Sequence, residues 1–196
     1  MFKKFFIACI FAVFASTAFA QTTTLSISVT TNNFGTIDYV CVLLTWNGMS
    51  GNRALASDHS SLITKAKVFL DKLHTQYPNA KVKIMGIQLP SPNGGLAQNY
   101  GDATSGYGNY WGLVRTVFGL NLAYQDLANE AGYSDYVEFV NISAQFDSLY
   151  NMPYGQRAVN NRNPLTENAG TNGVHPSTYG YYQIADAIFA NLNKEF

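Results

Sequence analysis

Three short apolar runs constrain the fold of this chain more than any other feature. They cover residues 37–44, 80–89 and 136–142, contain several Val and Ile residues, and are each followed by polar or turn-forming residues. Near-continuous apolar runs of this length are typical of strands buried on both faces of a parallel sheet. The sequence therefore predicts a sheet covered by helices on both sides.

Amphipathic segments alternate with these runs. The spacing of apolar residues predicts helices over residues 60–77 and 111–131 and a closing helix after Pro176. The expected inward residues are Leu62, Ala66, Phe69, Leu70 and Leu73 in the first helix, Leu113, Val117, Leu120, Ala123, Tyr124 and Leu127 in the second, and Tyr181, Ile184, Ala185, Ile188, Phe189 and Leu192 in the third. Ser60 or Ser61 is the expected N-cap of the first helix, and Ser177 or Thr178 that of the last. The alternation predicts a single α/β domain over residues 21–196, with right-handed crossovers.

The first twenty residues are expected to form a separate segment. Lys3 and Lys4 precede an apolar run over residues 5–14, and Ala18-Phe19-Ala20 follows it. This order is typical of a secretory signal peptide that is cleaved after Ala20. The apolar run is too short for a comfortable membrane span. The sequence therefore predicts a secreted or periplasmic protein without a stable span. After the leader, residues 25–29 alternate apolar and polar side chains and predict a short edge strand.

Charge and cysteine content exclude several classes of protein. Without Lys3 and Lys4, ten of the 12 basic residues remain against 12 acidic ones, and no basic stripe is present. Nucleic acid is therefore not an expected partner. Cys41 would be the sole cysteine after cleavage, so no intrachain disulfide is expected. No cluster has metal-ligand spacing and no phosphate-binding loop is present, so no metal or cofactor is expected.

Two polar segments carry the residues of a candidate site. Residues 45–52 follow the first apolar run and include Asn47, whose amide N–H can stabilise an oxyanion. Residues 171–177 precede the closing helix and include Asn172 and His175, and an imidazole can move a proton at neutral pH. Because the ends of parallel strands meet at one edge of a sheet, we expect Asn47 and His175 to lie at the same edge.

These residues resemble those of the SGNH (GDSL-type) ester hydrolases. Asn172-Gly173-Val174-His175-Pro176, followed by Gly180-Tyr181 and a helix, is similar to the Asp-x-x-His-Pro block of that family, and the segment around Asn47 is similar to its Gly-x-Asn-Asp block. The resemblance covers about residues 37–196. It implies a three-layer α/β/α, flavodoxin-like fold that is truncated at its N-terminal strand. It also implies that His175 is a general base, that Asn47 is an oxyanion donor and that Asn172 takes the place of the orienting carboxylate.

The chain departs from the family pattern in ways that leave the site incomplete. Asn172 is not Asp, and an amide cannot stabilise an imidazolium by charge. Thr45 and Gly48 replace the residues that flank the family's Asn, and no Gly-Asp-Ser nucleophile block precedes Asn47. The loop serines Ser50 and Ser91 are alternative nucleophiles, although loop serines more often cap or turn the chain. Asp147 and Glu167 are alternative carboxylates. His59 and His74 are expected at the start and on the solvent side of the first helix.

Two classes of function follow. The first is a secreted hydrolase of small-molecule or glycan esters, including carbohydrate acyl esters, with a degenerate Ser-His-Asp site. The second is a non-catalytic glycan-binding or structural module on the same scaffold, similar to the phage-tail components that share these blocks. In that module Tyr100, Tyr107, Tyr110 and Trp111 would stack on sugar rings. The sequence leaves the substrate and the oligomeric state open.

Overall fold

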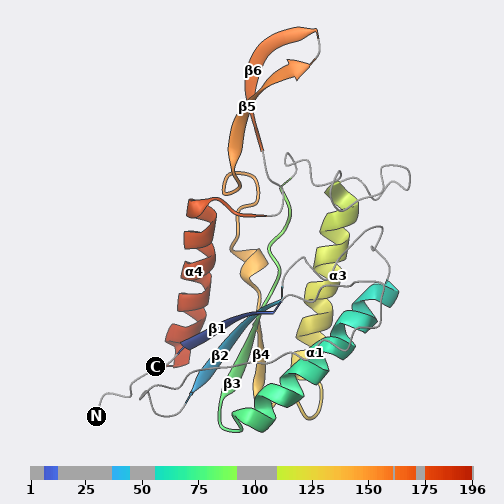
Figure 1. The fold of residues 1–196 in the computed structure, drawn as a ribbon, viewed down its shortest axis with the longest axis vertical. Helices are drawn as coiled ribbons and strands as arrows, with labels where there is room; N and C mark the ends of the chain where they lie inside the picture. The colour runs from blue at the N-terminus through green and yellow to red at the C-terminus, as the bar shows by residue number, and fades with distance from the viewer. Residues whose placement is uncertain are drawn as a thin grey trace.

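The centre of the protein is a four-stranded parallel sheet (Figure 1). The computed structural model describes residues 7–12, 37–44, 56–91, 110–160, 162–170 and 175–195. The strands are β1 (Ile7–Ala12), β2 (Tyr39–Leu44), β3 (Lys81–Met85) and β4 (Val137–Val140), and they lie in that order across the sheet. The predicted apolar runs thus form β2, β3 and β4, and the predicted α/β class is confirmed.

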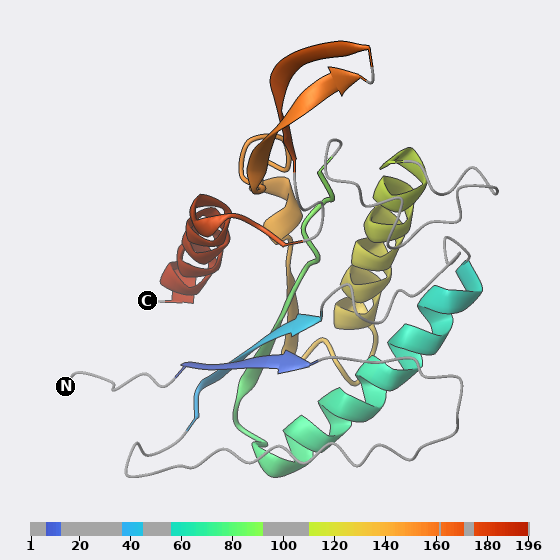
Figure 2. The same cartoon turned by 45° about the horizontal axis from the view of Figure 1, so that its top comes forward.

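Helices cover both faces of the sheet, as Figure 2 shows. The helices α1 (Ala56–Gln76) and α3 (Tyr110–Asn129) lie on one face, and α4 (Thr178–Leu192) lies on the other. Alternate residues of each strand enter the two layers: Val40 and Val42 pack in the core with α1 and α3, whereas Cys41 packs in the core with α4. The arrangement is the expected three-layer α/β/α sandwich.

The strand beside β2, which was expected to be missing, is supplied by residues of the predicted leader. Ile7–Ala12 pairs in parallel register with Tyr39–Leu44 along all six residues. An apolar run suits either a signal peptide or a buried strand, because both require a continuous hydrophobic segment. Cleavage after Ala20 stays a prediction. If it occurs, it removes β1 and opens the outer edge of β2. The predicted strand over residues 25–29 lies outside the described residues.

The α1–α3 layer follows the predicted pattern in its core and departs from it at its surface. All five predicted inward residues of α1 are buried, as are Val117, Leu120, Tyr124 and Leu127 of α3. Leu113 lies outside the residues whose side chains are described, and Ala123 is half-buried. Ser60 and Ser61 do not cap α1, because the helix begins at Ala56; the Ser60 carbonyl instead accepts a hydrogen bond from Thr64.

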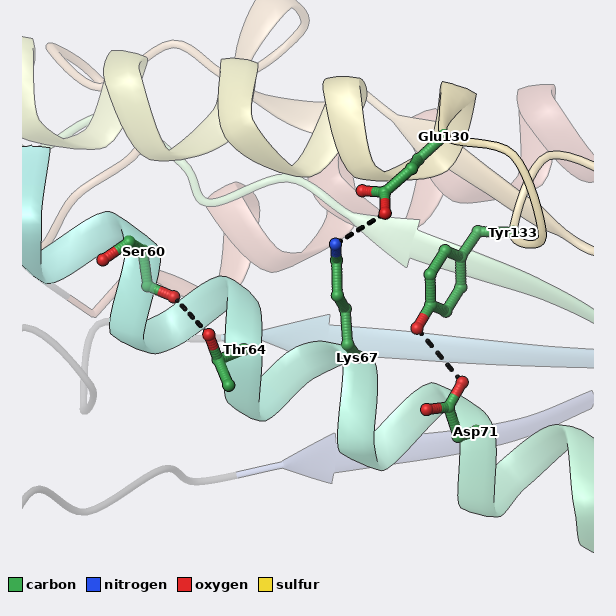
Figure 3. Close-up of polar contacts among 6 residues, drawn as sticks. All are labelled: Ser60, Thr64, Lys67, Asp71, Glu130 and Tyr133. Carbon is green, nitrogen blue, oxygen red and sulfur yellow. Dashed lines mark hydrogen bonds and ion pairs between the residues drawn. The ribbon is translucent and has the colours of Figure 1, made fainter.

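Polar side chains connect α1 to the end of α3 (Figure 3). Lys67 Nζ lies 2.7 Å from Glu130 Oε1, and the Tyr133 hydroxyl donates to Asp71 Oδ1 at 3.1 Å. His74 is not on the solvent side as predicted. Its ring stacks on Tyr136 with centroids 4.0 Å apart, because the turn after α3 folds back over α1. Burial, followed by the negative charge of Asp71, raises the pKa of Tyr136 to about 12.

A hairpin that the sequence did not predict projects from the sheet edge where α4 begins (Figures 1 and 2). Its strands are β5 (Tyr154–Asn160) and β6 (Asn163–Gly170), which pair antiparallel with Arg157 opposite Glu167. The segment is polar and lacks the alternation that marks a half-buried strand, which is why no strand was predicted there. A two-stranded ribbon has only one hydrogen-bonded ladder. Its stability is therefore marginal unless it packs against the body of the protein.

The orientation of α4 agrees only in part with the prediction: Ile184 and Leu192 are buried and Ile188 is half-buried, as expected. The helix buries Gly180, Ile184, Ala187 and Leu192. Tyr181, Ala185 and Phe189 were expected to face the core, but they are exposed. In this orientation Gly180 faces the loop before the hairpin, in a close contact described below that has no room for a side chain.

Candidate functional site

The loop–helix junction that carries His175 is held by a cap at the start of α4. Ser177 is the N-cap, in an extended conformation, and its hydroxyl accepts a hydrogen bond from the Gly180 N–H at 3.3 Å. Pro176 is buried directly before it, whereas His175 is exposed. The predicted Ser177 cap is confirmed. The side chain of His175 is thus placed on the surface at a junction whose backbone is fixed.

The loop over residues 146–152 packs against this junction and forms hydrogen bonds with it. The Asn151 carbonyl accepts hydrogen bonds from both the N–H and the hydroxyl of Ser177, each at 2.9 Å. Gln183, in the second turn of α4, accepts from the Asp147 N–H at 2.7 Å and from the Asn151 amide at 2.8 Å. Four hydrogen bonds therefore connect the two segments that meet beside His175.

Gly180 is required for this approach. A Cβ at position 180 would lie 2.3 Å from the Asn151 carbonyl oxygen and 2.8 Å from Pro176 Cβ. Both contacts are far inside van der Waals distance, and the nearer atom belongs to the backbone. The glycine after His-Pro is therefore a packing requirement that keeps the 146–152 loop against the first turn of α4.

The structure tests the alternative nucleophiles and carboxylates only in part. Ser91 is 2% exposed, which excludes it as an accessible nucleophile in this conformation. Asp147 Oδ1 accepts from the N–H groups of Leu149 and Tyr150, so that carboxylate oxygen stabilises its own loop. Glu167 lies in β6, in the projecting hairpin. Asn47, Ser50 and Asn172 lie outside the described residues, as do Tyr100 and Tyr107 of the long loop. Tyr110 and Trp111 lie in the first turn of α3.

A second polar arrangement holds the chain where it leaves β3. Asn121 of α3 is 5% exposed and binds both backbone groups of Ile87: it accepts from the N–H at 2.8 Å and donates to the carbonyl at 2.9 Å. The Asn121 amide thus pairs with the backbone of Ile87 in the way that the backbone of a neighbouring strand would. Gly86 allows the approach of Asn121, since a Cβ at position 86 would lie 3.3 Å from Asn121 Oδ1 and 3.0 Å from Phe139 Cζ. Sequence reasoning missed Asn121, although a lone amide on the apolar face of a helix was a visible signal.

An ion pair with one buried partner lies on the α4 face of the sheet, near the opposite end of α4. Lys83 of β3 is 1% exposed, and its Nζ lies 2.6 Å from Glu138 Oε2 of β4. Asn191 of α4 donates to the other carboxylate oxygen at 3.0 Å. Burial alone would raise the pKa of Glu138, but the hydrogen bonds from Asn191 and Lys83 and the charge of Lys83 outweigh it and lower that pKa. A cavity of about 460 Å³ borders this pair.

The described residues contain no group of three or more His, Cys, Asp or Glu side chains placed to hold a metal ion. Within the same residues, no helix combines the length and the apolar composition that crossing a bilayer requires.

Comparisons with known proteins identify a similar fold. No protein-family model matches the sequence, and a search of curated proteins finds no match. A solved structure from Streptococcus pneumonia, named as that of "a putative platelet activating factor", is similar with a TM-score of 0.52 and 17% sequence identity. The similarity covers 80% of this chain, which spans 60% of the length of that protein. At this identity the comparison supports the α/β architecture.

Proposed function

We propose that this protein is an exported ester hydrolase of the SGNH type, which uses His175 as its general base. The observation that carries the proposal is the placement of His175. An exposed imidazole stands at the start of a helix whose N-cap Ser177 and second-turn Gln183 are held to a neighbouring loop by four hydrogen bonds. A general base must be held in position and must also be reachable by substrate, and this junction supplies both conditions.

The proposed chemistry is acyl transfer. A hydroxyl oxygen attacks the carbonyl carbon of the ester while His175 takes the hydroxyl proton. The tetrahedral oxyanion accepts a hydrogen bond from an N–H of Asn47. When the bond to the leaving alcohol breaks, His175 returns the proton to the alcohol oxygen, and water then hydrolyses the acyl intermediate by the same two proton transfers. Asn172 would accept a hydrogen bond from the imidazole and fix its tautomer, without the charge that a carboxylate adds.

The first test is hydrolysis of p-nitrophenyl acetate by the wild type and by His175→Ala. We expect saturation kinetics in the wild type and a loss of about 10²–10⁴-fold in kcat/KM in the variant, which is the usual contribution of a general base. Saturation matters, because any surface imidazole attacks this ester in a reaction that rises linearly with substrate. A linear dependence, or equal rates in the two proteins, would contradict the proposal.

The second test is the substitution Asn172→Asp. If Asn172 occupies the orienting position, restoring a carboxylate stabilises the imidazolium in the transition state, so kcat rises by at least about tenfold. An unchanged kcat would remove Asn172 from the site. Labelling with a fluorophosphonate probe, followed by peptide mapping, would identify the nucleophile directly. Expression with residues 1–20 intact and N-terminal sequencing of the exported protein would test cleavage after Ala20.

A non-catalytic glycan-binding or structural module is the second candidate. The absence of a Gly-Asp-Ser block before Asn47, together with Asn172 in place of Asp, favours it. It predicts no fluorophosphonate labelling and no saturable hydrolysis, combined with retention on glycans. The two candidates therefore differ in every kinetic measurement above.

A further inference from the structure

The outward face of α4 is unusually aromatic for a solvent-exposed helix surface. Tyr179, Tyr182 and Phe189 are 75%, 63% and 68% exposed; we call these three residues the aromatic face. Tyr182 and Phe189 are seven residues apart, so they lie above one another on the same side of the helix, about 10 Å apart along its axis. Tyr179 lies beside Tyr182, with ring centroids 6.5 Å apart in an edge-to-face arrangement.

Low charge distinguishes α4 from α1. Asp186 is the one charged residue between Thr178 and Leu192, whereas α1 carries Asp58, Lys65, Lys67, Asp71 and Lys72. Exposed helix positions are usually polar or charged, because they contact water throughout. Large exposed apolar surfaces on a soluble domain generally mark a binding site. The aromatic face is therefore a surface with an unassigned partner.

We propose that the aromatic face binds the sugar rings of a neutral polysaccharide and directs the polysaccharide chain toward His175. The binding of the polysaccharide does not depend on catalysis. Only the second part of the inference, that the bound chain is directed toward His175, rests on the proposed function. An aromatic ring packs its face against the apolar C–H side of a pyranose, and a tyrosine hydroxyl adds a hydrogen bond to a sugar hydroxyl. A row of rings along a helix suits a partner that is itself a row of rings.

The chemistry of the face favours a neutral glycan over other partners. It has no Lys or Arg with which to bind phosphate groups, and Asp186 would repel them. Two of its three rings carry hydroxyl groups, which suit a hydrated ligand better than a lipid core.

The aromatic face begins close in sequence to His175 of the candidate site. Tyr179 follows His175 by four residues, and the loop that holds the first turn of α4 carries Tyr150, which is 72% exposed. A polymer bound along Tyr182 and Phe189 would therefore reach the start of α4, where His175 lies. This is the position at which an acyl group on that polymer would meet the general base.

The test is depletion of the full-length chain by insoluble xylan, amorphous cellulose and chitin, with Tyr182→Ala/Phe189→Ala as the variant. The matched control is Phe118→Ala, which removes an equally exposed ring (59%) from α3 on the other side of the sheet. We expect the wild type and the control to bind at least one polysaccharide, and the double variant to bind it about tenfold more weakly. Equal melting temperatures of the variants would show that folding is not the cause.

The outcomes separate the inference from the proposed function. Retention that the double variant loses supports the inference, even if no ester is hydrolysed. Unchanged binding of His175→Ala with loss of p-nitrophenyl acetate hydrolysis supports both. The inference is overturned if the wild type binds none of the polysaccharides, or if the double variant binds as the wild type does. It is also overturned if light scattering shows that the aromatic face instead mediates a dimer, or if sedimentation shows that it binds phosphatidylcholine vesicles.

Discussion

Gly180 and Asn151 approach so closely that a Cβ on Gly180 would lie 2.3 Å from the Asn151 carbonyl oxygen. Gly180→Ala should therefore push the 146–152 loop away from α4. We expect a loss of about 1–3 kcal/mol of stability, the usual cost of overpacking, together with lower ester hydrolysis because His175 shifts. Thermal unfolding and initial rates would measure the two effects.

Gly132→Ala is the matched control for that substitution. Gly132 has φ +93° and no atom within 4 Å of a built Cβ, so alanine there meets backbone strain but no clash. A cost of about 1 kcal/mol and unchanged hydrolysis are expected. Equal effects of the two substitutions on hydrolysis would show that the contact with Asn151 does not position the site.

Lys83 and Glu138 form a pair in which one partner is buried and the other is half-exposed. Glu138→Ala leaves a buried ammonium without its carboxylate, so we expect a loss of about 2–4 kcal/mol in urea unfolding, moderated by the exposure of Glu138. The double variant Lys83→Met/Glu138→Ala should recover most of this loss, because it removes both charges. A double variant that is as unstable as Glu138→Ala would contradict the explanation.

The lowered pKa of Glu138 makes the stability of the fold depend on pH. A carboxyl group with a lower pKa in the folded state stabilises the protein above its ordinary pKa of 4.5, and this contribution disappears as pH falls through the folded pKa. The difference in urea midpoint between the wild type and Glu138→Gln should therefore be largest near pH 7 and shrink toward about pH 3. A constant difference across this range would show that charge does not cause it.

Asn121 supplies the missing partners of the Ile87 backbone. Asn121→Ala leaves a buried N–H and a buried carbonyl unpaired, and we expect a loss of about 2–3 kcal/mol with faster amide exchange at Ile87. Asn129→Ala, at an exposed position of the same helix, should change stability by less than about 0.5 kcal/mol. Unchanged protection of the Ile87 amide in Asn121→Ala would contradict this role.

The pattern of apolar residues was sufficient to predict strands β2, β3 and β4 and the helices that cover them. The residues 62, 66, 69, 70 and 73 of α1 are buried as predicted, because a helix in contact with a sheet must place one stripe of its surface in the core. The His-Pro junction was predictable for a similar reason. Its cap depends on the local chain alone, and Ser177 forms it as expected.

The same reasoning failed where distant segments compete for one position. Phe189 and Tyr181 are apolar enough to face the core, but they are exposed in the orientation of α4 that places Gly180 against Asn151. Lys83 reads as a solvent-facing residue, yet a carboxylate on the next strand allows it to be buried. Neither partner is adjacent in sequence, so no local pattern could reveal the outcome.

The amino-acid sequence by itself determined the three buried strands β2, β3 and β4, the three helices, and that His175 stands before a capped helix, because these features depend on residues within one or two turns of the chain. The tertiary structure decided which side of α4 faces water and which loop holds the histidine in place. It also decided that residues 7–12 pair with β2. Those choices depend on which distant groups can pack and form hydrogen bonds together, and only the folded chain brings the groups within reach.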